Sequence, residues 1–74
     1  MQKLQFQLRP QDDFIELNKL LKLQQIAQSG GHANLLIEDG EVKVNGKVEY
    51  RKRNKIRAGD VIEIDAVQIV VEKG

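Results

Sequence analysis

The amino-acid sequence predicts a small α+β domain in which one strand precedes two helices and a mostly antiparallel sheet follows them. Three observations support this prediction. Apolar residues alternate with polar ones over residues 4–8, recur at three- and four-residue spacing over residues 13–39, and alternate again after Gly40. The 74 residues suit one domain, and they show no internal repeat or linker. We therefore expect a single domain over residues 1–74.

The first strand and the first helix are separated by a proline. Every second residue over 4–8 is apolar, as in a half-buried strand, and Pro10 ends the strand because proline has no N–H to donate. A helix is predicted from about Asp13 to Leu23, with Asp12 and Asp13 as the N-cap and first-turn acids. The helix should therefore begin soon after the proline.

The predicted first helix has an apolar stripe and a cationic face. Phe14 and Leu17 begin the stripe, so both are expected in the core. Lys19 and Lys22 lie off the stripe and toward the C-terminal end, where cations are favoured. These two lysines are candidate ligand-binding residues, with a plain solvent-exposed helix face as the alternative.

Small residues interrupt the helical pattern at Ser29, Gly30 and Gly31. Ser29 is expected to cap a second helix over about residues 31–39, and Gly40 to end it in the left-handed conformation. The backbone N–H groups of the same turn could also receive a phosphate, because glycines allow a close approach. The turn is thus a candidate anion site as well as a cap.

A hairpin is expected after Gly40. Val42 and Val44 point to one side of a strand, which leaves Lys43 on the other side. Asn45-Gly46 is a strong signal for a type I′ turn, which needs positive φ at both central positions. A second turn is expected at residues 58–60, followed by strands over residues 61–64 and 67–71.

Positive charge is concentrated between Lys43 and Arg57. This segment holds seven basic residues and one acid, Glu49, a balance of +6, whereas the rest of the chain has a balance of −5. Such a surface attracts polyanions, because each neutralised phosphate releases bound counterions. A solvated loop between strands is the alternative. The candidate phosphate-binding residues are Lys43, Lys47, Arg51, Lys52, Arg53, Lys55 and Arg57, and Asn45 could donate to a sugar hydroxyl or a phosphate.

The residues that most catalytic and metal sites need are scarce. The sequence has no cysteine and one histidine, His32, so thiol chemistry and a zinc site are not expected. No catalytic triad or phosphate-loop motif is recognisable, and no stretch approaches the roughly 20 apolar residues that cross a bilayer. These features predict a soluble, cytoplasmic, monomeric and non-catalytic protein without a cofactor, a membrane partner or a small-molecule substrate.

Four motifs occur in the order, and close to the spacing, of a known family. They resemble the alpha-L RNA-binding domain, named after a primary rRNA-binding protein of the small ribosomal subunit, and they cover about two thirds of the chain. Small stand-alone bacterial members, which also carry an Arg-Lys-Arg block after the hairpin, are the most similar. The motifs are Leu17-Asn18-Lys19-x-Leu21, Ser29-Gly30-Gly31 with Ala33 and Ile37, Gly40-x-Val42-x-Val44-Asn45-Gly46, and Gly59-Asp60-x-Ile62.

The resemblance implies a non-catalytic module that holds structured RNA, such as rRNA or tRNA, with a role in ribosome or RNA metabolism. Enzymes of the family attach the domain to a separate catalytic domain, and none fits within these residues. The family usually has arginine where this sequence has Glu16, and residues 30–34 carry no fixed positive charge. The resemblance therefore assigns RNA contact mainly to the hairpin and the basic block.

Two other classes of function remain as alternatives. The Asn45-Gly46 hairpin and the late Gly59-Asp60 turn are also similar to those of β-grasp sulfur carriers. Those proteins end in a flexible Gly-Gly tail, whereas this sequence ends Glu72-Lys73-Gly74, which disfavours the carrier. The third class is a basic protein-interaction module that binds an acidic partner, and salt-sensitive RNA binding would separate it from the first.

Overall fold

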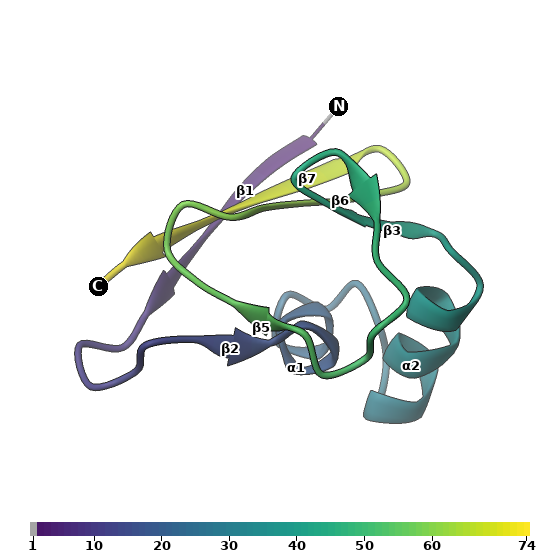
Figure 1. The fold of residues 1–74 in the computed structure, drawn as a ribbon, viewed down its shortest axis with the longest axis horizontal. Coiled ribbons are helices and arrows are strands. Elements are labelled where there is room, and N and C mark those ends of the chain that lie inside the picture. Colours follow the sequence, from purple (N-terminus) through teal and green to yellow (C-terminus); the bar gives the residue numbers. More distant parts are fainter. Residues whose placement is uncertain (1) are drawn as a thin grey trace.

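One five-stranded sheet and two short helices form the two layers of the molecule, and a two-stranded ribbon lies beside them (Figure 1). The computed structural model describes residues 2–74. The predicted α+β order is confirmed. In chain order, the elements are β1 (Gln2–Leu8), β2 (Ile15–Glu16), α1 (Leu17–Leu23), α2 (Gly30–Glu38), β3 (Val42–Val44), β4 (Lys47–Val48), β5 (Lys55–Ile56), β6 (Val61–Ile64) and β7 (Val67–Lys73).

The main sheet has the strand order β1-β7-β6-β3-β4. β1 and β7 run parallel, with Leu4 opposite Ile69, while the other three pairs are antiparallel. The first and last strands are therefore neighbours and share one ladder of backbone hydrogen bonds. This pairing places the two terminal strands of the described chain side by side, with Gln2 and Lys73 at opposite ends of the pair.

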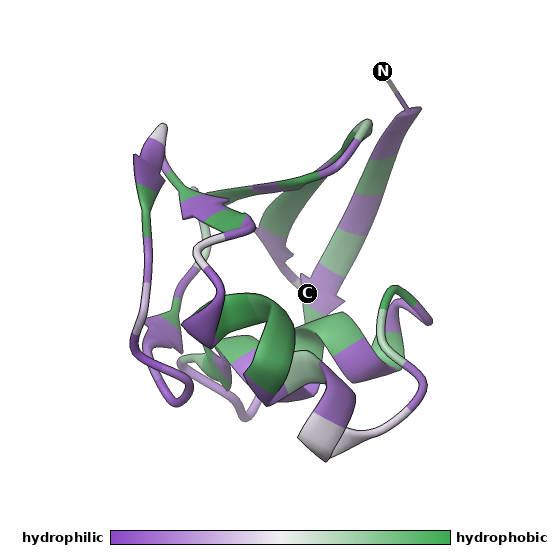
Figure 2. Ribbon diagram, turned by 90° about the vertical axis from the view of Figure 1, so that its right-hand side faces the viewer, coloured by the Kyte–Doolittle hydropathy of each residue, from purple (hydrophilic) through white to green (hydrophobic). Residues whose placement is uncertain are grey.

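The core lies between the inner face of the sheet and the helices. Alternate strand residues point inward, and Figure 2 shows hydrophobic and hydrophilic residues alternating along the strands above the helical layer. The fully buried side chains come from every layer, which is how so short a chain makes one continuous core. They include Val42, Ile62 and Ile69 of the sheet, Leu17, Leu20 and Leu21 of α1, and Ile37 of α2.

The predicted turns around α2 and the hairpin are confirmed. Asn45 and Gly46 have φ values of 53° and 85°, as a type I′ turn requires. Ser29 caps α2, because its Oγ accepts a hydrogen bond from the N–H of His32 at 3.1 Å. Gly40, with φ of 77°, follows the end of this helix. α2 begins and ends one residue earlier than predicted.

The first helix starts later than the sequence predicts. α1 begins at Leu17, and the residue before it is Glu16, which is extended and makes no side-chain cap. Asp12 and Asp13 are therefore not cap residues. The carboxylate of Asp12 instead accepts a hydrogen bond from Nε of Arg9 at 2.9 Å.

Strand pairing overrides the helical pattern at the start of the predicted helix. Ile15 and Glu16 pair antiparallel with Ile56 and Lys55 of β5, a strand that the sequence does not predict. The pairing buries both isoleucines. Because neighbouring side chains on an extended chain point in opposite directions, Phe14 turns outward and is 38% exposed, although it was expected in the core.

Candidate nucleic-acid interface

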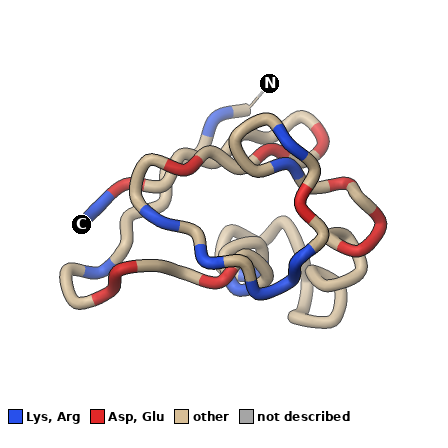
Figure 3. Tube along the Cα trace, in the orientation of Figure 1, with Lys and Arg blue, Asp and Glu red and all other residues tan. Residues whose placement is uncertain are grey.

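Five cations follow one another along the segment that leads from the hairpin to β6. All five are exposed, and Figure 3 shows the basic positions of this segment along one arch of the chain that passes α1. We call this feature the basic ridge; it consists of Arg51, Lys52, Arg53, Lys55 and Arg57.

The backbone of the basic ridge is anchored to the start of α1. The N–H of Leu17 donates to the carbonyl of Asn54 at 2.9 Å, and the N–H of Asn18 donates to the carbonyl of Lys52 at 3.0 Å. These N–H groups belong to the first turn of the helix and would otherwise lack a partner. The backbone of the ridge is therefore held to α1 by hydrogen bonds, unlike a solvated loop that only connects two strands.

The first two cations of the ridge have carboxylate partners. Nη2 of Arg51 lies 3.1 Å from Oε1 of Glu49, and Nζ of Lys52 lies 3.1 Å from Oε1 of Glu38 at the end of α2. The hydrogen bonds from the Arg51 side chain hold the pKa of Glu49 below its ordinary value and raise the pKa of Arg51. Part of the positive charge is thus balanced within the protein.

The last two cations of the ridge lie over an aromatic ring. Nζ of Lys55 is 5.0 Å and Cζ of Arg57 is 5.9 Å from the centre of the Phe14 ring, within the range of cation–π attraction. Ile56 between them is fully buried, so its neighbours point outward. Glu16 is opposite Lys55 in the strand register, but the ammonium group forms its contact with the ring.

The hairpin presents its own cations on a different part of the surface. Lys43 and Lys47 are exposed, and Lys43 is opposite Glu63 of β6 in the strand register. The side chain of Asn45 has a structural role. Its Nδ2 donates to Asp60 at 3.0 Å, while its Oδ1 accepts from the N–H of Val61 at 2.9 Å. Asn45 therefore fastens the hairpin to the start of β6.

The candidate ligand-binding residues of the two helices lie in separate parts of the structure. Lys19 lines, together with Phe14, a groove between the end of β1 and α1, which no residue of the basic ridge lines. Lys22 occupies the last turn of α1, as predicted. Ser29, Gly30 and Gly31 lie at the opposite end of α2 from Glu38, the residue that Lys52 contacts. The structure therefore does not join this turn to the ridge.

Two residues of the interface were not identified from the sequence. Phe14 was expected in the core, and only its position directly before the first paired residue of β2 explains its exposure. Asn18 holds the ridge through its N–H and also donates from Nδ2 to Oδ1 of Asn34 at 3.1 Å. The Leu17-Asn18-Lys19 motif was the one signal that pointed to Asn18.

His32 completes the turn before α2. Its Nδ1 accepts a hydrogen bond from the N–H of Gln28 at 3.1 Å, next to the Ser29 cap. Within residues 2–74, no group of three or more His, Cys, Asp or Glu side chains is placed to hold a metal ion. In the same range, neither helix is long and apolar enough to cross a membrane.

The family model of the S4 domain matches residues 7–72. The chain belongs to the S4 domain family. The match includes both helices, the hairpin and the whole basic ridge, and S4 domains are not a class of enzyme. This assignment agrees with the alpha-L resemblance and disagrees with the β-grasp alternative.

Two bacterial proteins are similar to this S4 domain over most of their length. YbcJ of Escherichia coli (strain K12) is 47% identical over 58 residues, which cover 76% of this chain and 83% of YbcJ. RlbA of Bacillus subtilis (strain 168), named as a probable ribosome maturation protein, is 40% identical over 53 residues, 72% of this chain and 75% of RlbA.

The solution structure of YbcJ from E. coli has a similar fold. Its TM-score is 0.65 at 43% sequence identity, and the match covers 89% of this chain and 85% of the YbcJ chain. That structure is described as having an alpha-L motif involved in RNA binding. The fold and the family of this chain are thus supported by both sequence and structure.

Proposed function

We propose that this S4 domain protein binds structured RNA, with rRNA or tRNA as the RNA class, through its basic ridge. The observation that carries this proposal is the ridge itself, in which exposed cations stand on a backbone anchored to α1. Phosphate contacts supply most nucleic-acid affinity, and a fixed ridge loses little conformational freedom when it binds. Lys43 and Lys47 lie on the hairpin, apart from the ridge, and would contact a separate part of the same folded RNA.

Structured RNA suits this surface better than a single strand. Proteins that bind single strands rely on rows of aromatic side chains on which successive bases stack. The ridge has five cations and one adjoining ring, Phe14, so it is suited to the phosphates of a folded RNA. Tyr50 is also exposed, but its ring lies against Gly40, where an added Cβ would be 3.3 Å from it.

The proposed role is that of a non-catalytic, monomeric RNA holder in the cytoplasm, acting in ribosome or RNA metabolism. The name of RlbA and the RNA-binding motif described in YbcJ support this role. The absence of cysteine suits a reducing compartment. A basic module that binds an acidic protein is the competing role.

A charge-matched pair of variants tests the proposal. Fluorescence anisotropy would measure binding to an rRNA stem-loop and to a tRNA over a range of salt concentrations. We expect Lys55→Ala with Arg57→Ala to weaken binding roughly a hundredfold, because the variant loses two contacts with charged groups that cost about 1.5 kcal/mol each. The control is Lys3→Ala with Lys73→Ala, which removes the same charge outside the ridge.

The control pair should bind RNA nearly as well as the unaltered protein. Equal losses in both pairs would show that only net charge matters, and the ridge would then have no special role. Salt-insensitive binding, or no binding to either RNA, would favour the protein-interaction module. Crosslinking in cells followed by sequencing of the attached RNA would then identify the natural RNA.

A further inference from the structure

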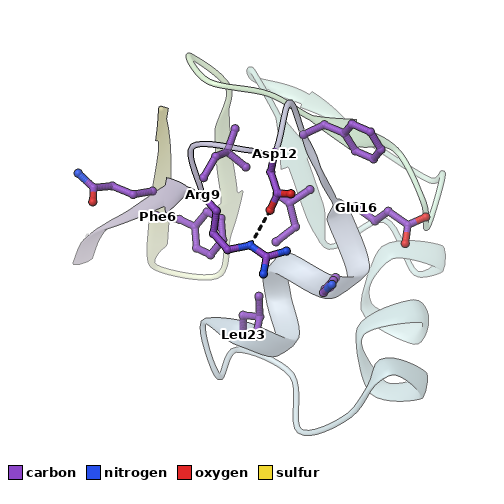
Figure 4. Close-up of a pocket in the computed structure, with 10 residues that line it drawn as sticks. Phe6, Arg9, Asp12, Glu16 and Leu23 are labelled. Atoms are coloured by element: carbon purple, nitrogen blue, oxygen red, sulfur yellow. Dashed lines mark hydrogen bonds and ion pairs between the residues drawn. The ribbon is translucent and has the colours of Figure 1, made fainter. Parts of the chain in front are cut away.

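A groove opens beside the basic ridge, and Phe14, whose ring contacts two cations of the ridge, forms part of its lining. The groove lies between the end of β1, the loop that follows and α1, and has a volume of about 600 Å³ (Figure 4). Ligand sites in proteins have volumes of this order. The apolar part of the lining consists of Phe6, Leu8, Phe14, Ile15 and Leu23.

The polar part of the groove carries no net charge. Arg9 and Lys19 supply two cations, and Asp12 and Glu16 supply two carboxylates. Nε of Arg9 donates to Oδ2 of Asp12 at 2.9 Å, and Figure 4 shows this pair at the groove between Phe6 and Glu16. The groove therefore offers hydrogen-bond donors and acceptors, while the adjoining ridge is cationic.

Phe14 connects these two environments. Lys55 and Arg57 lie over its ring, yet neither of them lines the groove. Part of the Phe14 side chain therefore faces the groove and is not covered by Lys55 or Arg57. Because Phe14 is 38% exposed, a flat guest in the groove could contact it without disturbing the core.

We propose that this groove receives one unstacked nucleobase of the RNA whose phosphates contact the basic ridge. The inference rests on the proposed function and narrows its ligand to a folded RNA with a bulged nucleotide beside a paired stem. A nucleotide joins a neutral, flat base to an anionic phosphate. The surface is complementary to it, since a groove without net charge adjoins a cationic ridge. The base stacks on Phe14, and Arg9 and Asp12 face its polar edge.

An RNA stem-loop with one bulged nucleotide tests this inference against the same stem with every base paired. The bulged base is a fluorescent adenine analogue, whose emission falls when it stacks on an aromatic ring. We expect the protein to bind the bulged RNA roughly tenfold more tightly, because stacking of one base on an aromatic side chain supplies a factor of this order. We also expect the emission to be quenched on binding.

Three variants separate base stacking from the other roles of Phe14. Phe14→Ala should lose the preference for the bulged RNA and the quenching, and its loss of affinity for the paired stem, through Lys55 and Arg57, should be the smaller effect. Phe14→Tyr keeps a ring and should restore both. Leu35→Ala is the control, because Leu35 is an exposed apolar residue of α2 that lines neither groove nor ridge.

The outcomes distinguish the groove from the ridge. Equal affinity of the unaltered protein for the two RNAs, without quenching, would overturn the proposed binding of a base in the groove. It would leave the proposal that the ridge binds RNA intact. An equal loss for both RNAs in Phe14→Ala would also overturn the binding of a base in the groove, since Phe14 would then only position Lys55 and Arg57. The absence of binding to either RNA would overturn both proposals.

Discussion

The two ends of the basic ridge carry similar cations but have different neighbours. At one end, which we call the paired end, Arg51 and Lys52 each lie 3.1 Å from a carboxylate oxygen, of Glu49 and Glu38 respectively. Both pairs are near solvent, with Arg51 76% exposed and Lys52 47% exposed, so each adds little to stability. The carboxylates nevertheless compete with any phosphate for these two cations.

At the other end, which we call the aromatic end, Lys55 and Arg57 lie over Phe14. Within residues 2–74, no carboxylate forms an ion pair with either of them. A phosphate can therefore approach without first breaking an ion pair, and the ring contacts both cations. The comparison teaches that equal charge in the sequence does not mean equal availability at the surface.

The aromatic end depends on a buried residue, and its loss should have the largest effect. Ile56 is fully buried opposite Ile15, and it fixes the outward direction of Lys55 and Arg57. Ile56→Ala should lower the free energy of unfolding by about 2–5 kcal/mol in urea titrations, whereas Ile56→Val should lower it by about 0.5–1.5 kcal/mol. Unchanged stability in the alanine variant would mean that β2 and β5 do not support this end of the ridge.

The affinity for RNA should depend more on the aromatic end than on the paired end. Lys55→Ala with Arg57→Ala should reduce the slope of binding against salt by roughly 0.7–0.9 for each lost phosphate contact. Arg51→Ala with Lys52→Ala should reduce it by less, because the carboxylates already balance these cations. Parallel salt titrations of both double variants measure the difference, and equal slopes would remove the distinction between the two ends.

The features that the sequence predicts well are those set by near neighbours. Asn45-Gly46 requires positive φ at two adjacent positions, and both have it. Ser29 caps a helix that begins at the next residue, and Gly40 follows the end of the same helix. Each of these signals acts within a few residues, so local composition is sufficient to predict it.

The features that the sequence does not predict depend on distant partners. Phe14 continues the helical spacing of α1, but pairing of Ile15 with Ile56 keeps the chain extended there and turns Phe14 outward. The positions of the cations were evident from composition, whereas the contact of Lys52 with Glu38 arises only because the ridge passes the end of α2. Tertiary contacts therefore decide which of the predicted cations are available.

The paired end also provides the smallest and most specific test. Glu49→Gln removes the negative charge beside Arg51 but keeps an oxygen that can accept from the Arg51 N–H, as Oε2 now does at 3.1 Å. We expect the affinity for RNA at neutral pH to rise roughly threefold, since an exposed ion pair is worth under about 1 kcal/mol. Glu38→Gln, which frees Lys52 in the same way, is the matched variant.

The same variant also tests a pH dependence of stability that Glu49 gives to the paired end. Hydrogen bonds from Arg51 lower the pKa of Glu49 in the folded state, so its ionised form stabilises the fold above the ordinary glutamate value near 4.5. That contribution is lost as the pH falls from this value through the lowered pKa. Thermal unfolding followed across this range should therefore show a weaker acid dependence in Glu49→Gln than in the unaltered protein. Identical profiles would mean that Arg51 does not hold Glu49 in solution, and Arg51 would then be as available to phosphate as Lys55 and Arg57.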